Sequence, residues 1–109
     1  MKLSVFVVTY NQEKYIRQCL DSILMQEVDF DYEVVIGEDH GTDATRAICE
    51  EYAAKYPQVR LLPLIENLGV VKNWLRTISV CKGEYVALCE GDDYWTDENK
   101  LKEQVRFLD

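Results

Sequence analysis

Apolar runs alternate with polar loops and with segments of helical periodicity along the whole chain. Four runs rich in β-branched and aliphatic residues predict strands, because a strand covered on both faces is apolar at nearly every position. They span residues 3–8 (LSVFVV), 32–37 (YEVVIG), 59–64 (VRLLPL) and 84–89 (EYVALC). Pro63 cannot donate a backbone hydrogen bond, so we expect the third run to lie at or near a sheet edge.

After each strand, apolar residues recur at the three- and four-residue spacing of a helix. Asn11 is placed to cap the first helix, with Glu13 in its first turn, and the second helix is expected to end before Pro57. Gly83 is placed to end the third helix, and Thr96 to cap the last. The side chains expected to face the core are Tyr15, Ile16, Cys19, Leu20, Ile23 and Leu24, then Ala44, Ala47, Ile48 and Tyr52, then Val71, Trp74, Leu75 and Ile78, and finally Leu101, Val105 and Leu108.

Strands that alternate with helices predict a parallel sheet with right-handed crossovers. We therefore expect an α/β fold, a Rossmann-like, open, mostly parallel sheet with helices on both faces. A chain of 109 residues has room for one domain, and no linker, repeat or low-complexity segment divides it. No run approaches the roughly 20 apolar residues of a membrane-spanning helix.

The chain is acidic, with a formal net charge of −8. This balance argues against a nucleic-acid partner, because binding to a phosphate backbone requires a basic face. It leaves room for a single nucleotide, since a metal ion can supply the positive charge. The four cysteines show no CxxC spacing, so we expect no zinc site. Cys19 and Cys49 are predicted to pack as small hydrophobes in a reducing cytoplasm.

Acidic and polar residues follow three of the predicted strands, at residues 9–11 (TYN), 38–40 (EDH) and 90–93 (EGDD). Ligands of open α/β sheets bind beyond the carboxyl ends of the strands, so we expect these segments to converge. Close carboxylates repel each other unless a cation intervenes, and oxygen ligands suit Mg²⁺ or Mn²⁺. The pattern predicts a site where acids hold a divalent metal and a phosphate. Solvated loop acids are the alternative, which we favour for Asp97 and Glu98.

Four segments, VVTYN, EDHGTD, ENLG and EGDD, resemble in this order the nucleotide-sugar-binding half of family 2 glycosyltransferases. These are inverting enzymes with a GT-A fold. Each motif is weak alone, but four at matching spacing form a specific pattern, and the resemblance spans essentially all 109 residues. It implies that residues 1–109 are the N-terminal, donor-binding part of a truncated GT-A domain, and that the acceptor-binding half with the catalytic base is absent. We therefore expect this fragment to be inactive alone.

The resemblance also implies roles for single residues. Thr9, Tyr10 and Asn11 would lie against the nucleotide, with the Tyr10 ring beside the base; a tyrosine that simply packs is the alternative. The Asp39 carboxylate would accept a hydrogen bond from the base. The full predicted donor-binding set is Thr9, Tyr10, Asn11, Glu13, Asp39, Asn67, Gly69 and Asp92, and the predicted metal ligands are Asp92 and Asp93.

The chain departs from the commoner family pattern at several positions. Glu38 stands where the family's second loop begins with aspartate, and Glu90 stands at the first acid of the DxD motif, which leaves the role of Glu90 open. Gly91 would let the backbone approach the ligand, and Gly69 would supply a special backbone angle. The one histidine, His40, replaces a glycine, and we expect it to be solvated rather than to bind the ligand.

Together these features predict transfer of a sugar from a nucleotide diphosphate to an acceptor hydroxyl, with Mn²⁺ or Mg²⁺ assisting. A UDP-sugar is the expected donor, with GDP and dTDP left open. We expect a glycan or lipid-linked acceptor, a role in polysaccharide or cell-surface glycan synthesis, and a cytoplasmic location at the inner face of the membrane. Apolar surface left by the missing half would favour self-association.

Two other classes of protein share some of these features. A receiver-like Mg²⁺-binding domain also carries acids at strand ends, but it needs an acidic pair after the first strand, where this chain has TYN. A non-catalytic nucleotide-binding module is the other alternative. The sequence does not specify the sugar, the acceptor, the catalytic base or the oligomeric state.

Overall fold

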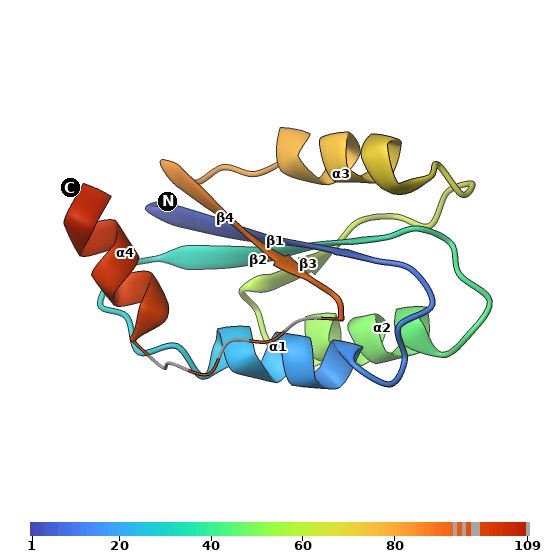
Figure 1. Ribbon diagram of the computed structural model, residues 1–109, viewed down its shortest axis with the longest axis horizontal. Helices are drawn as coiled ribbons and strands as arrows, with labels where there is room; N and C mark the ends of the chain where they lie inside the picture. The colour runs from blue at the N-terminus through green and yellow to red at the C-terminus, as the bar shows by residue number, and fades with distance from the viewer. Residues whose placement is uncertain (93, 95, 97–98, 109) are drawn as a thin grey trace.

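The computed structural model describes residues 1–92, 94, 96 and 99–108, with 107 and 108 described by their backbone. In this part of the chain, four parallel strands form one sheet in the order β3-β2-β1-β4. The elements are β1 (Leu3–Thr9), α1 (Ile16–Leu24), β2 (Tyr32–Glu38), α2 (Thr45–Lys55), β3 (Val59–Leu61), α3 (Val70–Ser79), β4 (Tyr85–Glu90) and α4 (Lys100–Leu108). Figure 1 shows α1 and α2 on one face of the sheet, α3 on the other, and α4 beside the ends at which the strands begin. The predicted open α/β sheet with helices on both faces is confirmed.

The third strand lies at an edge of the sheet, as Pro63 predicts. Within the described residues β3 pairs with β2 alone. The predicted strand over 59–64 is too long, because the ladder ends where the Leu62 N–H donates to the Ile36 carbonyl, just before the proline.

The hydrophobic core lies between the sheet and the helices α1 and α2. The predicted stripe of α1 is confirmed for Ile16, Leu20 and Ile23, which are fully buried. Tyr15 is instead half exposed, because it precedes the helix. The buried members of this cluster are Leu3, Val5, Val7, Ile16, Cys19, Leu20, Ile23, Val34, Ile36, Cys49, Tyr52, Val59, Cys89 and Leu101. Cys19 and Cys49 thus pack among apolar side chains, as predicted.

The inward face of α2 agrees with the predicted one at Tyr52 and Ile48 and differs at the alanines. Thr45, Cys49 and Tyr52 are buried, whereas Ala44 and Ala47 are exposed. Cys49 packs as predicted, whereas a threonine does not stand out in a hydrophobic pattern, so Thr45 is the inward residue that the pattern does not identify. The predicted end of this helix before Pro57 is confirmed.

The fully buried residues of α3 are polar, and the stripe predicted for this helix is wrong at two of its four positions. Val71 is 70 % exposed and Leu75 is 54 % exposed, whereas Asn73 and Thr77 are buried against the sheet. The cause is the close approach of α3 to Gly37 of β2. A Cβ at Gly37 would overlap Thr77 Oγ1, and the Asn73 Nδ2 donates to the Gly37 carbonyl at 2.8 Å.

Strand β4 is buried on one face only, which corrects its interpretation as a buried strand. Val86 and Leu88 are exposed on the α3 side, while Cys89 is buried on the α1 side. In the described part of the chain β4 is an edge strand, and these two side chains remain 43% and 37% exposed.

Several predicted helix ends also change. Asn11 lies before a turn and caps no helix, and α1 begins at Ile16 without a side-chain cap. Gly83 does not end α3, whose C-cap is Val80. Thr96 is not the cap of α4, which begins at Lys100.

Helix α4 packs beside the segment that follows the C-terminal end of α1. The predicted burial of Leu101 and Val105 is confirmed, and the Leu101 N–H donates to Gln26 Oε1 at 2.9 Å. The side chain of Leu108 and all of Asp97 and Glu98 lie outside the described residues. No helix in the described chain is long and apolar enough to cross a membrane.

Candidate functional site

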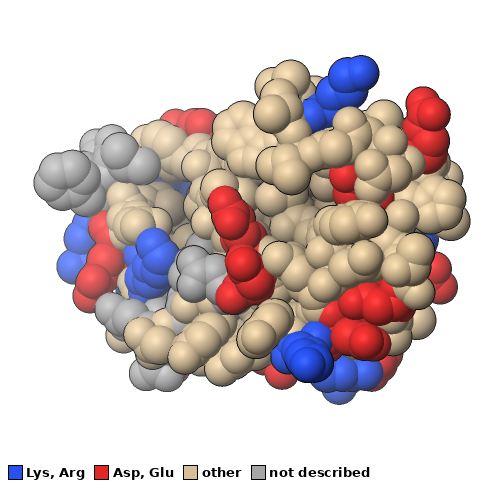
Figure 2. All heavy atoms as spheres, turned by 45° about the vertical axis from the view of Figure 1, so that its right-hand side comes forward, with Lys and Arg blue, Asp and Glu red and all other residues tan. Residues whose placement is uncertain are grey.

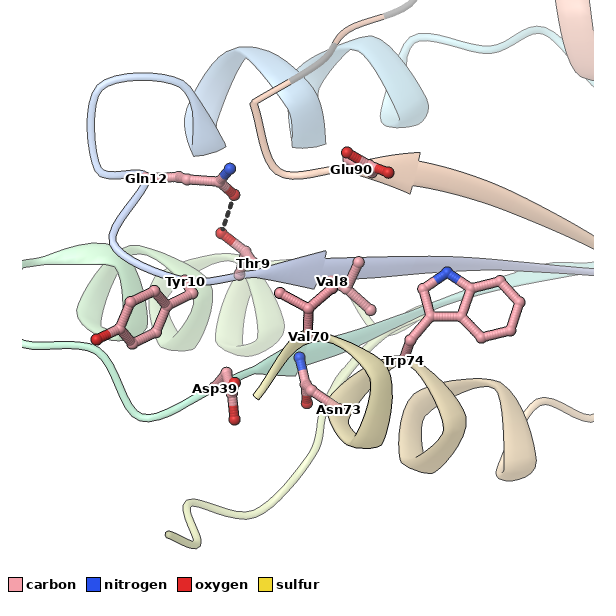
Figure 3. A pocket seen from close by; sticks show the side chains of 9 residues that line it. All are labelled: Val8, Thr9, Tyr10, Gln12, Asp39, Val70, Asn73, Trp74 and Glu90. Atoms are coloured by element: carbon pink, nitrogen blue, oxygen red, sulfur yellow. Dashed lines mark hydrogen bonds between the residues drawn. The ribbon is translucent and has the colours of Figure 1, made fainter. Parts of the chain in front are cut away.

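A pocket of about 250 Å³ opens where β1, β2 and β4 end (Figure 3). Its lining comes from the end of β1 and the loop after it, from the residue after β2, from the first turns of α3 and from the end of β4. The lining residues are Val8, Thr9, Tyr10, Gln12, Asp39, Val70, Asn73, Trp74 and Glu90. Four segments that are far apart in sequence therefore converge here, and three of them are the strand ends expected to meet in an open α/β sheet.

Asp39 is the most strongly held acid of the pocket and is only 4 % exposed. Its two carboxylate oxygens accept the N–H groups of Leu68 at 2.8 Å and Gly69 at 3.0 Å. The Asn67 side chain donates to the Asp39 carbonyl at 2.8 Å. A carboxylate has about four acceptor positions, so Asp39 retains capacity for a ligand N–H.

Asn67 and Gly69, which belong to the predicted donor-binding set, therefore lie behind Asp39 rather than in the pocket lining. Gly69 has φ of +86°, a left-handed conformation that favours glycine, so its predicted special backbone angle is confirmed. Gly69 holds the Asp39 carboxylate and Asn67 holds the Asp39 backbone, and direct contact with a ligand remains a prediction for each.

Glu38 is turned away from the pocket, although it directly precedes Asp39. It is 1 % exposed, accepts the Gly41 N–H at 2.7 Å and pairs with Arg46 at 3.5 Å. The acid that replaces the commoner aspartate thus fixes the second loop against α2.

Asn11 and Glu13 join the first loop to the second. Asn11, in a left-handed conformation, accepts the Thr42 N–H through Oδ1 at 2.7 Å, and Glu13 accepts the Ala44 N–H at 3.3 Å. Both side chains are exposed and outside the pocket lining. The structure therefore gives them a visible role in holding the loops, and their predicted contact with the donor remains a prediction.

The pocket has one open aromatic side chain and one anchored aromatic side chain. Tyr10 is 47 % exposed at the pocket, so part of its ring is open to a ligand, and stacking on a base remains a prediction. Trp74 packs edge-on against Phe6, with ring centroids 5.2 Å apart. Asn73, which precedes Trp74 on α3, has a buried Oδ1 without a hydrogen-bond partner among the described residues.

Of the acids predicted at the end of the fourth strand, one lines the pocket. Glu90 lines it, Asp92 is exposed two residues on, and Asp93 lies outside the described residues. No group of three or more His, Cys, Asp or Glu side chains in the described chain is arranged to hold a metal. In Figure 2, which brings this end of the sheet forward, acidic side chains stand near the centre of a largely uncharged surface.

His40 follows Asp39 but does not enter the pocket lining. It is exposed, and its Nδ1 lies 2.7 Å from the Ile65 carbonyl oxygen, which connects the second loop to the third.

Sequence reasoning missed Gln12, Val70, Asn73 and Trp74 as lining residues. Gln12 lies between two residues that were selected, and the other three lie in the first turns of the helix after the ENLG segment. The start of this helix could have been included among the predicted lining residues, because the helix begins at the same edge of the sheet at which the strands end.

The model of the family "Glycosyl transferase family 2" matches residues 4–109. An uncharacterized protein of Mycobacterium tuberculosis, Rv1520, is 50% identical over 109 residues, which covers 98% of this chain and 31% of that protein. Poly(ribitol-phosphate) β-N-acetylglucosaminyltransferase TarS of Staphylococcus aureus is 37% identical over 111 residues, covering 100% of this chain and 19% of TarS.

Solved structures match over nearly the whole chain. TarS residues 1–349 from S. aureus in complex with UDP-GlcNAc gives a TM-score of 0.88 at 35% identity, covering 99% of this chain and 31% of that one. The mannosyltransferase PcManGT of Pyrobaculum calidifontis, in complex with GDP-Man and Mn²⁺, gives 0.88 at 27% identity, covering 98% and 32%. The chain thus spans about a third or less of the length of these relatives.

Proposed function

The chain belongs to glycosyltransferase family 2, and we propose that its pocket binds the nucleotide-sugar donor of a sugar-transfer reaction. Its sheet and helices have the GT-A fold. The observation that carries the proposal is the pocket at the carboxyl edge of the sheet, where Asp39 is held by the third loop and Tyr10 stands open at the rim. A buried, oriented acceptor beside an exposed ring suits a planar base with N–H donors.

We propose a UDP-sugar as the donor. An oriented carboxylate favours a base that offers an N–H and rejects one that does not, because an unpaired buried charge is costly. Uracil and guanine both offer such a donor, so Asp39 alone does not choose between them. The more similar of the two solved relatives carries UDP-GlcNAc, which supports UDP.

Glu90 and Asp92 are the described residues that fit a divalent cation. Both are exposed carboxylates at the end of β4. Mg²⁺ commonly takes one or two protein carboxylates and completes its shell with phosphate oxygens and water, so two acids suffice. When bound, the metal would neutralise charge on the departing diphosphate. Asp93 stays a predicted ligand outside the described residues.

The acceptor and the catalytic base belong, in this proposal, to the part of the relatives that this chain does not span. The acceptor would be a glycan or a lipid-linked glycan in polysaccharide or cell-surface synthesis, at the cytoplasmic face of a membrane. The chain alone would bind the donor without transferring the sugar. Its exposed apolar side chains on α3 and β4 would then favour self-association.

Calorimetric titration with UDP, UDP-sugars and GDP, with and without Mn²⁺, tests the proposal. The variant Tyr10→Ala is expected to weaken UDP binding about tenfold, since stacking on a base contributes about 1–3 kcal/mol. Tyr15→Ala is the matched control, because Tyr15 is equally exposed but outside the pocket lining. A folded chain that binds none of these nucleotides would refute the proposal. Acetyl phosphate labelling without nucleotide binding would point to the receiver class.

A further inference from the structure

Two residues of the pocket lining, Thr9 and Gln12, pack against Gly91, which follows the lining residue Glu90. The Thr9 hydroxyl donates to Gln12 Oε1 at 2.8 Å, the bond drawn in Figure 3. A Cβ on Gly91 would lie closer than 3.0 Å to both of these oxygens. The Gly91 N–H in turn donates to the Val8 carbonyl at 3.0 Å. The backbone at Gly91 therefore rests directly on the hydrogen-bonded pair of side chains.

We propose that Gln12 is a positioning residue of the donor site, and that its hydrogen bond with Thr9 sets the position of the chain at Gly91. This inference rests on the proposed function. Gly91 is buried between two exposed acids, Glu90 and Asp92. The position of its backbone therefore sets the positions of the two residues that carry these carboxylates. A shift of Gly91 moves both of them relative to a bound metal, and Mg²⁺ demands near-ideal octahedral geometry.

Gln12 is itself held from the opposite side. Its backbone N–H donates to Thr45 Oγ1 at 2.8 Å, and Thr45 is fully buried at the start of α2. The Thr45 hydroxyl donates in turn to Asp43 Oδ1 at 2.6 Å. Burial opposes the charge of Asp43, but hydrogen bonds from Thr45 and from the Glu13 N–H outweigh it and lower the pKa of this carboxyl. Gln12 thus connects Asp43, which precedes α2, to the segment that carries Glu90 and Asp92.

This geometry assigns different tasks to the two sides of the pocket. Asp39 and Tyr10 face the base, and their contribution should not depend on a metal. Gln12 acts through Gly91 on the acids, so its contribution should appear when Mn²⁺ is present. The ratio of UDP affinity with Mn²⁺ to UDP affinity without it separates the two tasks.

The test measures this ratio for the 109-residue chain and for variants of the pair. Gln12→Ala and Thr9→Val each remove the hydrogen bond and are expected to lower the ratio about tenfold, the usual effect of one such bond. Thr9→Ser keeps the hydroxyl and should retain the wild-type ratio. The double variant Gln12→Ala/Thr9→Val should lose no more than either single variant, because both break one interaction.

Two results would overturn the inference. One is an equal loss of affinity with and without Mn²⁺ in Gln12→Ala. The other is additive losses in the double variant, which would indicate that Gln12 contacts the donor independently of Thr9. If the wild-type chain binds no nucleotide, the proposed function fails by itself, and a second readout still judges this inference.

That second readout is amide hydrogen exchange at Gly91, followed by NMR without any ligand. The Gly91 N–H bonds to Val8, so its protection reports the seating of the loop. Gln12→Ala should speed exchange at Gly91 about tenfold and leave the N–H of Leu62 on the opposite sheet edge unchanged. Unchanged exchange at Gly91 would show that the pair does not position this loop.

Discussion

The two faces of the sheet are covered in different ways. On one face, Ile16, Leu20 and Ile23 of α1 are fully buried in an apolar core. On the other, α3 approaches β2 so closely that Asn73 and Thr77 meet the backbone of Gly37. The first face is held by burial of apolar side chains. The second combines the packing of Trp74 on Phe6 with close backbone contact and hydrogen bonds.

The apolar core and the candidate site thus lie on opposite faces of the sheet. The pocket lies on the α3 face, and three of its lining residues come from α3. Side chains of β1 and β4 on this face include Val8 and Glu90, which are neighbours in the sheet register. A tightly packed apolar layer over this end would leave no room for a ligand, so the face with the site is the polar and more open one.

The largest expected effect is loss of core packing on the α1 face. Leu20→Ala removes buried methyl groups and leaves a cavity, which costs about 3 kcal/mol. Leu75→Ala, on the outer side of α3 and 54 % exposed, should cost well under about 1 kcal/mol. Urea unfolding measures both free energies. Equal losses in the two variants would contradict the difference between the faces.

The next effect breaks the close contact on the α3 face. Gly37→Ala places a methyl group on Thr77 Oγ1, and forced rearrangement of this kind costs about 2 kcal/mol. Thr77→Ala in the same chain removes the clashing hydroxyl and should recover part of the loss. If Gly37→Ala unfolds at the wild-type urea concentration, α3 is not held by this contact.

This contrast also explains which helices could be predicted from the sequence. The stripe of α1 is apolar and faces an apolar core, so periodicity located Ile16, Leu20 and Ile23 correctly. In α3 the two fully buried residues, Asn73 and Thr77, are polar. The same method therefore missed them and chose the exposed Val71 and Leu75, although its choice of Trp74, which packs on Phe6, is confirmed. Hydrophobic periodicity identifies a buried face only when burial is what holds the helix.

The site was predictable to a similar extent. Thr9, Tyr10 and Asp39 follow strands, and the chain topology carries them to the pocket. Asn11 and Glu13 also follow a strand, but their side chains turn to the second loop, a choice made by backbone conformation and hydrogen bonds that no pattern records. Gln12 was overlooked because its role depends on a contact with Gly91, 79 positions later in the chain (91 − 12).

A smaller effect concerns Glu33, a buried acid on the α3 face. Burial alone would raise its pKa, but hydrogen bonds from Ser4 and the Lys82 N–H, with the charge of Arg60, outweigh burial and lower it. A lowered pKa in the folded state stabilises the protein above the unfolded pKa, near 4.3, and this contribution is lost as the pH falls through the folded value.

Glu33→Gln should therefore cost about 1–2 kcal/mol at pH 7, the effect of a hydrogen bond to a charged group. It should also flatten the loss of stability that the wild type shows below about pH 4.3. Unfolding curves at several pH values measure both changes. The exposed Glu27, changed to Gln, is the control. If the free energy of unfolding falls as steeply at low pH in Glu33→Gln as in the wild type, Glu33 is not the source of this pH dependence.

The smallest effect on stability is expected at the exposed apolar side chains of β4, where the effect should instead be on self-association. Leu88 stands exposed on the α3 side of an edge strand, beside Val86. Edge strands with apolar side chains pair readily with other chains, and a lysine there prevents it. Leu88→Lys should change the free energy of unfolding by less than about 0.5 kcal/mol. At concentrations where the wild type associates, the variant should also sediment as a monomer.

Met25→Lys, an equally exposed position at the end of α1, should leave association unchanged. If both variants dissociate the chain equally, general charge rather than the α3 face is responsible.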